Sequence, residues 1–401
     1  MLKGKSRESC CPLCGNAQRA LIFQQRFEAL GSASLMSGYD VVSCEKCGFV
    51  FAVGIPATED FRRYYAEASK YEFSHAGGKQ HSYEVSRLAD LASWIGEHCP
   101  RDVRLIDVGC ATGELLVQLR RLGFKSLTGL DPSESCVRYG SEQLGLRIIR
   151  GVLDMRPENE RPFDVLVLSA VLEHIPELDA SIEQMASWVG TEGQVVLEVP
   201  DAAHFADAFN APYQEFSVEH INFFSAESLT NLMEKHGFRA QAERHYVCNA
   251  GAGVTGAGLT MIFQMGGVSR PPRKETVSIE GVRRYLTKCA SWVEHESRII
   301  SDLVASQEPI LVWGTGTLCQ RLLATTPFRD ANIVAFIDSN PHYQGMELHH
   351  RRILAPSELV RLKEPVLITS WAFQAEIENQ IRNTMGLTNR LIGLIPQGGP
   401  A

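Results

Sequence analysis

The chain has 401 residues, of which 44% are apolar and 21% charged, and this composition excludes a disordered, collagen-like or coiled-coil protein. The length suggests about two or three globular domains. With 39 Lys and Arg against 47 Asp and Glu, the formal net charge of −8 argues against a dedicated binder of nucleic acid or membrane surfaces. No stretch approaches the ~20 apolar residues of a membrane helix, and the first residues lack the apolar core of a secretory signal. We therefore expect a cytoplasmic protein.

Two Cys-x-x-Cys-Gly strings stand near the N-terminus. The first contains Cys11 and Cys14, and the second contains Cys44 and Cys47. Such a turn directs two thiolates at one tetrahedral ion, and the glycine lets the backbone curl beneath the sulfurs. A redox dithiol needs only one pair beside a βαβ unit, and the 11 Cys of a long intracellular chain do not indicate a disulfide framework. The spacing predicts a structural zinc site with four Cys ligands, and Cys10 is a spare thiol beside it.

The sequence pattern divides the chain into four units. Residues 1–60 carry the cysteine pairs, in short β runs and turns. Residues 61–268 alternate apolar β runs with amphipathic helices, the pattern of a parallel sheet covered by helices. Residues 269–306 start with the polar, Pro-rich string SRPPRKET and continue as a long amphipathic helix. Residues 307–401 begin a second β/α alternation.

A Gly-rich turn follows the first apolar strand of the second unit, in the string RLIDVGCATGELLVQLRRLGF. Small residues there let a ligand approach the backbone, and the helix that follows offers free N–H groups. Asp131 ends the next strand, where a carboxylate can accept both ribose hydroxyls of a nucleoside, although capping the helix at DPSES explains it as well. A dinucleotide site is the rival interpretation. The carboxylate of Asp107 suits a cationic ligand better than a pyrophosphate.

The turn DVGCATG is similar to the S-adenosylmethionine motif of class I methyltransferases, apart from Ala111 in the place of the middle glycine. Later strings resemble that fold in order: FDVLVLSAVLEHI its fourth strand, GQVVLEVP its fifth, and the segment ending in GLTMIFQMG its last hairpin. The resemblance implies an α/β, Rossmann-like methyltransferase domain with S-adenosylmethionine as cofactor. It places seven residues against that cofactor: Asp107, Gly109, Cys110, Gly113, Asp131, Asp154 and Ser169.

The order of zinc knuckles, methyltransferase domain, long helix and second Rossmann-like domain resembles the zinc-containing C-methyltransferases of nucleotide-linked deoxysugar ketones. Their Tyr-x-Glu-His string, which lies over the sugar, matches Glu219 and His220 here, with Ser217 in the place of the tyrosine. Their aromatic string between the first two domains is echoed at Tyr65 and Tyr71. The resemblance implies that His220, oriented by Glu219, is a catalytic base and that Tyr71 faces the substrate.

The implied chemistry has simple requirements. C-methylation beside a carbonyl needs removal of an α-proton, a stabilised enolate and a methyl sulfonium in line with the carbon. A histidine held by a carboxylate can take the proton, and a tyrosine or second histidine can hydrogen-bond the enolate oxygen. O-methylation needs one base and could use the same His220. Glu219 and His220 could equally anchor a loop, and His174, after Glu173, reads as a helix-entry residue near the cofactor.

A second Gly-rich turn opens the last unit, in ILVWGTGTLCQRLL, with Gly314 and Gly316 before Asp338 at the end of the next strand. The third glycine of a dinucleotide motif is absent, because Cys319 stands in that register. The plainer interpretation is a Rossmann-like scaffold without a cofactor. The other is a site for the nucleotide of the substrate, with the string HHRR, residues 349–352, available for phosphates.

The predicted function is therefore S-adenosylmethionine-dependent methylation of a small molecule, namely C-methylation of a nucleotide-linked keto sugar. An O-methyltransferase acting on a sugar or other small molecule is one alternative, and a cofactor-binding scaffold without turnover is another. An RNA methyltransferase is disfavoured, because the N-terminal segment lacks a dense basic and aromatic stripe. The expected partners include neither nucleic acid nor membrane, and the sequence leaves the oligomeric state open.

Overall fold

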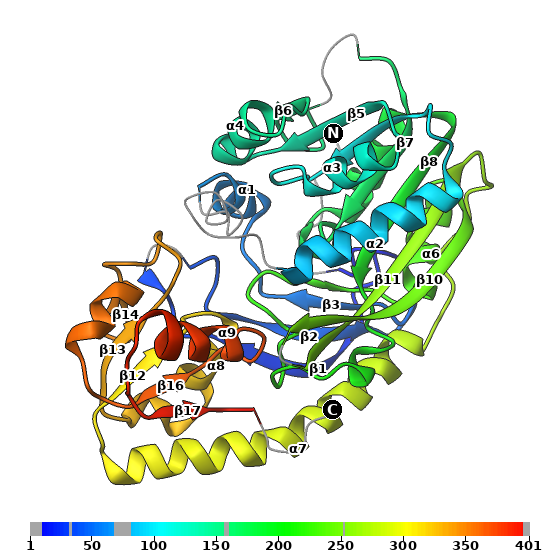
Figure 1. Cartoon of the computed structure of the whole chain (residues 1–401). Coiled ribbons are helices and arrows are strands. Elements are labelled where there is room, and N and C mark those ends of the chain that lie inside the picture. Colours follow the sequence, from blue (N-terminus) through cyan, green and yellow to red (C-terminus); the bar gives the residue numbers. More distant parts are fainter. Residues whose placement is uncertain (1–9, 32–33, 68–81, 156–159, 252, 396–401) are drawn as a thin grey trace.

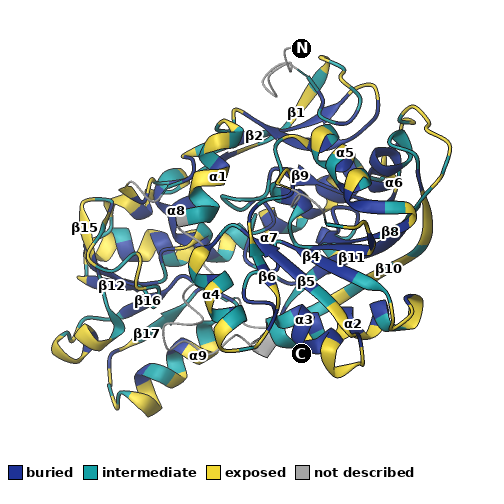
Figure 2. Ribbon diagram, turned by 90° about the horizontal axis from the view of Figure 1, so that it is seen from above, coloured by how far each residue is buried: buried dark blue, intermediate teal, exposed yellow. Residues whose placement is uncertain are grey.

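The computed structural model describes residues 10–31, 34–67, 82–155, 160–251 and 253–395. In this part of the chain the strands form three sheets, of four, seven and six strands (Figure 1). The inner strands of the central and C-terminal sheets lie in the buried interior, whereas most helices combine a buried inner face with an exposed outer one (Figure 2). This is the layered arrangement expected of an α/β protein.

The N-terminal sheet is an antiparallel meander of β1 (Arg19–Arg26), β2 (Gly38–Cys44) and β3 (Val50–Val53). Its fourth strand is β9 (Asn222–Phe223), which comes from a distant part of the sequence and pairs with β3. The helix α1 (Thr58–Glu67) follows this sheet. The sheet is therefore completed by the same loop that carries Glu219 and His220.

The central sheet has the order β10-β11-β8-β7-β4-β5-β6. Its strands are parallel except β11, which is antiparallel to both of its neighbours. The predicted last hairpin is thus present, as β10 and β11. The bounds of the seven strands are β4 Arg104–Val108, β5 Ser126–Asp131, β6 Ile148–Arg150, β7 Phe163–Ser169, β8 Val189–Pro200, β10 Phe238–Gly251 and β11 Val254–Met265.

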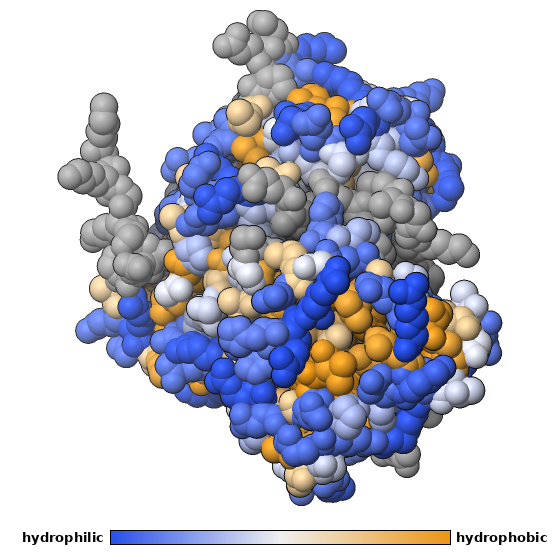
Figure 3. Space-filling model, turned by 90° about the vertical axis from the view of Figure 1, so that its left-hand side faces the viewer, coloured by the Kyte–Doolittle hydropathy of each residue, from blue (hydrophilic) through white to orange (hydrophobic). Residues whose placement is uncertain are grey.

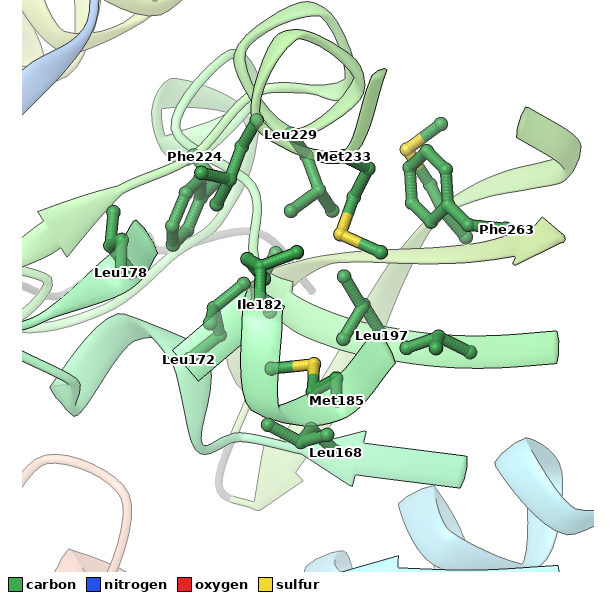
Figure 4. Close-up of a cluster of buried hydrophobic side chains, with 14 of the residues drawn as sticks. Leu168, Leu172, Leu178, Ile182, Met185, Leu197, Phe224, Leu229, Met233 and Phe263 are labelled. Atoms are coloured by element: carbon green, nitrogen blue, oxygen red, sulfur yellow. The ribbon is translucent and has the colours of Figure 1, made fainter. Parts of the chain in front are cut away.

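Helices cover both faces of the central sheet, and alternate residues of each strand point to opposite faces. Val165 and Val167 of β7 pack with α2 (Ser82–His98) and α3 (Glu114–Arg121). The intervening Leu166 and Leu168 face α5 (Leu178–Trp188) and α6 (Ala226–Lys235). Figure 4 shows the second face, where Ile182 and Met185 of α5 lie between Leu168 and Met233. A shorter helix, α4 (Glu134–Glu142), connects β5 to β6.

The helix α7 (Val277–Ser306) runs along one side of the molecule, from the central sheet to the C-terminal one (Figure 1). Its first half packs Val282, Tyr285 and Cys289 against the N-terminal sheet and the loop after β8. Its second half packs Ile300 and Leu303 into the C-terminal core. Apolar residues at helical spacing therefore bury one face along the whole helix.

The C-terminal sheet has the order β14-β15-β13-β12-β16-β17 and is parallel except at β14. Its helices include α8 (Thr317–Thr325), directly after the second Gly-rich turn, and α9 (Gln374–Asn379). The strand bounds are β12 Ile310–Trp313, β13 Ile333–Ile337, β14 Glu347–Leu348, β15 Arg351–Leu354, β16 Val366–Ile368 and β17 Leu391–Gly393.

Two further observations concern the hydropathy of the surface and the length and apolar character of the helices. On the face shown in Figure 3, hydrophilic side chains surround an apolar area in the lower half of the molecule. Among the described residues, no helix has both the length and the apolar character needed to cross a membrane.

Candidate functional site

The first Gly-rich turn connects β4 to α3 at the carboxyl edge of the central sheet. Gly109 and Gly113 have φ angles of 74° and 88°, which glycine adopts without strain. A Cβ at Gly109 would lie 2.6 Å from the side chain of Val171, so the turn also requires close packing. Ala111 replaces the middle glycine of the motif and still has a φ of 48°, in the left-handed region. The turn therefore has the backbone conformation of the glycine motif, although alanine stands in the place of its middle glycine.

Asp131 binds this turn from the end of β5. Its Oδ2 accepts a hydrogen bond from the backbone N–H of Ala111 at 2.8 Å, and its Oδ1 accepts one from the N–H of Ser133 at 2.9 Å. The N-cap of α4 is Ser133, whose hydroxyl accepts from the N–H of Cys136. Asp131 is therefore not the helix cap that the sequence allowed. It is a buried carboxylate fixed beside the turn.

A cleft opens beside the turn and collects four of the predicted cofactor residues, namely Asp107, Gly109, Cys110 and Ser169. Burial, with a smaller contribution from the charge of Asp131, raises the pKa of Asp107 to about 8. Burial also raises the pKa of the Cys110 thiol, so this group stays protonated at neutral pH. When burial has raised the pKa of a carboxyl group, a cationic ligand bound beside it favours the ionised form. The cleft therefore suits a positively charged molecule.

Sequence reasoning missed Arg87, which lines this cleft, and two polar residues connected to it. Arg87 of α2 donates a hydrogen bond to the hydroxyl of Ser169 at 3.0 Å and forms an ion pair with Glu198 of β8. Tyr246 of β10 donates to the same carboxylate, and burial raises the pKa of this tyrosine. Glu198 was detectable in the sequence, as a carboxylate inside the apolar run VVLEVP. Its partners were not, because α2 and β10 are distant in the chain.

Asp154 is not among the residues that line the cleft. Its carboxylate accepts a hydrogen bond from Arg62 of α1 instead. The side chains of Arg62 and Asp154 are 47% and 39% exposed. The contact therefore connects α1 to the loop after β6, and the role of Asp154 beside the cofactor stays a prediction.

Two histidines meet beyond the carboxyl edge of the sheet. The rings of His174 and His220 lie edge to face, with centroids 5.0 Å apart. His174 belongs to a short 3-10 turn after β7, so it is not the entry to a longer helix. One donor atom each from Glu173, His174 and His220 lies within 4.8 Å of the others, and Glu173 is almost fully buried. The structure thus forms a cluster that the sequence did not predict.

Backbone carbonyl groups orient both rings. Nδ1 of His220 lies 3.2 Å from the carbonyl oxygen of Glu215, and Nδ1 of His174 lies 3.0 Å from that of Glu219. Because a carbonyl group only accepts hydrogen bonds, each Nδ1 carries the proton in a neutral ring. Nε2 is then the basic nitrogen of both histidines.

The prediction that Glu219 orients His220 needs a correction. The Glu219 carboxylate accepts a hydrogen bond from the hydroxyl of Tyr64 at 2.9 Å, and the carbonyl of Glu215 is what holds His220. The hydroxyl of Ser217 accepts from the N–H groups of Glu219 and His220, at 3.4 and 3.2 Å, and so shapes this turn. A serine in the position of the tyrosine therefore has a local structural role.

Aromatic residues of α1 approach the same cluster. Tyr65 lies edge to face with His174, at 5.8 Å between centroids, and Tyr64 lies against Tyr65. The sequence indicated Tyr65 but not Tyr64. Tyr71, the other predicted residue, lies outside the described residues.

The four cysteines of the two knuckles come together. The Sγ atoms of Cys11 and Cys47 are 3.7 Å apart, and those of Cys14 and Cys44 are 3.5 Å apart. These distances are near the edge of about 3.8 Å that four sulfurs have around a zinc ion at about 2.3 Å. They are far longer than the disulfide bond length of about 2.05 Å. Cys10 is half-buried and outside this cluster.

The two knuckles share one backbone geometry. Gly15 and Gly48 have φ angles of 71° and 87°, and each N–H donates to the carbonyl oxygen of the first cysteine of its knuckle at 2.9 Å. A hydrogen bond from Cys11 lowers the pKa of the Cys14 thiol to about 7, so a thiolate forms readily there. The donor set therefore fits a tetrahedral, thiophilic ion.

The second Gly-rich turn repeats the hydrogen bonding of the first. Oδ2 of Asp338 accepts from the N–H and the hydroxyl of Thr315, at 2.8 and 2.6 Å, and its Oδ1 accepts from the N–H of Asn340. The N–H of Gly314 donates to the carbonyl of Ile337 at 2.9 Å, as Gly109 does to Leu130 at 2.8 Å. The string HHRR, residues 349–352, makes contacts within the protein. For example, Nε of Arg351 donates a hydrogen bond to the carbonyl of Ile333.

Comparisons with known proteins agree with this fold. Residues 79–243 match a family described as "Methyltransferase domain", and residues 306–392 match one described as "C2185-like, N-terminal". The O-methyltransferase cnsE of Penicillium expansum is 24% identical over 193 residues, which are 44% of this chain and 63% of that protein. A dTDP-3-amino-3,6-dideoxy-alpha-D-glucopyranose N,N-dimethyltransferase of Streptomyces fradiae is 31% identical over 139 residues, or 33% of this chain and 52% of that protein.

A solved structure also matches part of the chain. Magnesium protoporphyrin IX methyltransferase from Synechocystis PCC 6803 covers 52% of this chain with its whole length, at 13% identity and a TM-score of 0.40. The chain spans about half to two thirds of the length of the two curated relatives named above. The family match covers β4 to β8 together with the cleft and the histidine pair. The chain therefore contains a class I S-adenosylmethionine-dependent methyltransferase domain.

Proposed function

We propose that the protein transfers a methyl group from S-adenosylmethionine to a carbon atom beside the carbonyl of a nucleotide-linked keto sugar. The observation that carries the proposal is the pair of imidazoles, His174 and His220, at the carboxyl edge of a methyltransferase sheet. In an open α/β sheet, ligands bind at that edge. Two oriented imidazoles supply the base and the hydrogen-bond donor that an enolate mechanism needs.

The cleft beside the first Gly-rich turn would hold the cofactor. Asp131 would accept the ribose hydroxyls, and Asp107 would face the positively charged methionine end, where a cation stabilises its carboxylate. Gly109 and Gly113 let the ligand approach the backbone. When bound, the cofactor supplies an electrophilic methyl group.

The protein's own residues would then move one proton. Nε2 of His220 takes the proton from the carbon beside the carbonyl, and the carbonyl of Glu215 holds this ring in the basic tautomer. His174 would stabilise the developing enolate oxygen by donating a hydrogen bond when its Nε2 is protonated, and the buried Glu173 carboxylate lies 3.7 Å from that nitrogen. The electron pair left on carbon would accept the methyl group, and the electron pair of the broken methyl–sulfur bond would stay on the cofactor's sulfur. Tyr64 and Tyr65 lie beside the histidine pair, and the proposal that Tyr71 faces the substrate rests on the sequence resemblance alone.

Two further parts of the chain support a sugar nucleotide as substrate. The C-terminal sheet, which we interpret as a second Rossmann-like domain of residues 307–401, repeats the nucleoside-type turn at Asp338. The Streptomyces fradiae relative is, by its name, an enzyme acting on a dTDP-linked amino sugar. We further propose a structural zinc ion on Cys11, Cys14, Cys44 and Cys47, and a cytoplasmic location.

O-methylation is the second candidate. It is favoured by the Penicillium expansum relative, an O-methyltransferase whose match covers 44% of this chain. A single base suffices for that reaction, so His220 would keep its role and His174 would not need to bind an oxyanion. The acceptor atom thus distinguishes the two candidates.

A panel of nucleotide sugars, with and without a keto group, tests the proposal when incubated with isotopically labelled cofactor and analysed by mass spectrometry. We expect methylated product only from keto sugars, with exchange of the α-proton in deuterated water. His220→Asn should lower turnover by about 10²–10⁴-fold. His98→Asn is the matched control, because this histidine also bonds a carbonyl through Nδ1 but lies in α2, outside the cluster. Methylation of sugars without a keto group would contradict the enolate mechanism.

A further inference from the structure

A third group of potential ligands lies outside the cysteine cluster and the histidine pair. Asp201 follows β8 directly, His204 comes one turn later, and His245 projects from β10. Oδ2 of Asp201 is 2.7 Å from Nδ1 of His204 and 2.6 Å from Nδ1 of His245. The two imidazole centroids are 4.8 Å apart. Two segments distant in the sequence thus bring two nitrogens and one carboxylate oxygen to one point.

Each ring nitrogen of His245 faces a carboxylate oxygen, so its protonation must be explained. Its Nε2 lies 2.9 Å from Oε1 of Glu243, so Nε2 donates a proton to that carboxylate. In a neutral ring Nδ1 then has only a lone pair, which would face the carboxylate oxygen of Asp201 at 2.6 Å. Two lone pairs repel at this distance. The arrangement needs a positive charge, either as a second proton on the ring or as a cation between Nδ1 and Oδ2.

Several features favour a cation. The Asp201 side chain is fully buried, and its Oδ1 accepts from the N–H of Ala203, so the ligand oxygen is fixed in place. The carboxylate of Glu243 behind His245 is the outer partner that metal-binding histidines usually have. His204 and His245 are 42% and 37% exposed, which leaves room for a water ligand.

The neighbouring cations of α7 have other partners. Arg284 donates to the carbonyl of Ala203, and Lys288 donates to the carbonyls of Ala206 and Ala208. An ion with bonds of about 2.0–2.1 Å needs donor atoms about 3.3 Å apart. Binding of such an ion would therefore require the two partly exposed rings to move away from Oδ2 of Asp201, from which their Nδ1 atoms are now 2.7 and 2.6 Å apart.

We propose that Asp201, His204 and His245 form a divalent-cation site, selective for Zn²⁺ or a similar ion that prefers nitrogen and oxygen ligands. Three protein ligands with a solvent-accessible fourth position are typical of such zinc sites. A bound ion would tie β10 to the loop after β8, the loop that continues to His220. The inference does not depend on the proposed methyl transfer.

The metal content of the full chain tests the site. Protein saturated with Zn²⁺ and then dialysed is analysed by elemental mass spectrometry, and further Zn²⁺ is titrated by calorimetry. We expect one ion more per chain than in His245→Ala or His204→Ala. Glu243→Gln should bind this ion about 10–100-fold more weakly. His98→Ala, a histidine of α2 outside the group, should bind as the unchanged protein does.

Cobalt separates this site from the cysteine cluster. Co²⁺ on nitrogen and oxygen ligands lacks the thiolate charge-transfer bands that four cysteines produce, so the second ion has its own spectrum. Circular dichroism and thermal unfolding without added metal establish whether each variant is folded. If His245→Ala does not fold, His204→Ala replaces it in the test, because the side chain of His204 is the more exposed of the two. Equal metal content in the unchanged protein and both histidine variants would overturn the proposal. His245 would then be an imidazolium held by two carboxylates, which nitrogen NMR of the ring would show.

Discussion

Substitution of Asp131 by alanine tests the cofactor site most directly. The change removes the acceptor of two backbone N–H groups, of Ala111 at 2.8 Å and Ser133 at 2.9 Å. Leaving a buried donor without an acceptor costs about 1–3 kcal/mol of folding stability for each group. The lost contact of a charged carboxylate with the ribose adds a binding penalty of roughly 1.5–3 kcal/mol, or about ten- to a hundred-fold in affinity.

The second Gly-rich turn offers a matched control. Asp338 accepts hydrogen bonds from the N–H groups of Thr315 and Asn340 in the same pattern, but in the C-terminal sheet. Asp338→Ala should therefore lower the unfolding temperature in a similar way without changing the affinity for S-adenosylmethionine. Titration calorimetry and thermal unfolding measure the two effects separately. If Asp131→Ala is destabilised but binds the cofactor with unchanged affinity, the carboxylate only holds the turn and the assignment is refuted.

Two further changes address the cysteine cluster and the cleft. Cys44→Ser should lose the zinc ion and destabilise the N-terminal sheet, because metal binding is coupled to folding. Cys10→Ser should keep the zinc ion and the stability of this sheet. Metal analysis that finds no zinc in the unchanged protein would refute this site. The raised pKa of Asp107, about 8, predicts that the affinity for S-adenosylmethionine increases with pH up to about pH 8 and that binding releases a proton below it. Because the folded protein holds that proton more tightly than the unfolded chain, stability contributed by the protonated group is lost as pH rises toward 8, and Asp107→Asn should remove this pH dependence in thermal unfolding. A pH-independent affinity would show that Asp107 is already ionised in the free protein.

Features that depend on neighbouring residues could be predicted from the amino-acid sequence. The knuckle glycines Gly15 and Gly48 and the turn glycines Gly109 and Gly113 all have positive φ angles, in agreement with the tight turns that their strings predicted. The order of the strands that lead from the cofactor turn to the last hairpin is also as expected. These features could be recognised because φ preference, short spacing and hydrophobic periodicity act over a few residues.

Contacts between residues that are distant in the sequence became visible in the folded protein. The fold placed His174 beside His220, gave the orientation of His220 to the carbonyl of Glu215, and bound the Glu219 carboxylate to Tyr64. Every residue has a backbone carbonyl, whatever its side chain. The amino-acid sequence therefore could not indicate which carbonyl would hold His220. The arrangement of Asp201 with His245 has the same origin, since β8 and β10 reach one edge only after β11 has paired between them. Contacts of this kind depend on the packing of whole elements, which local sequence does not specify.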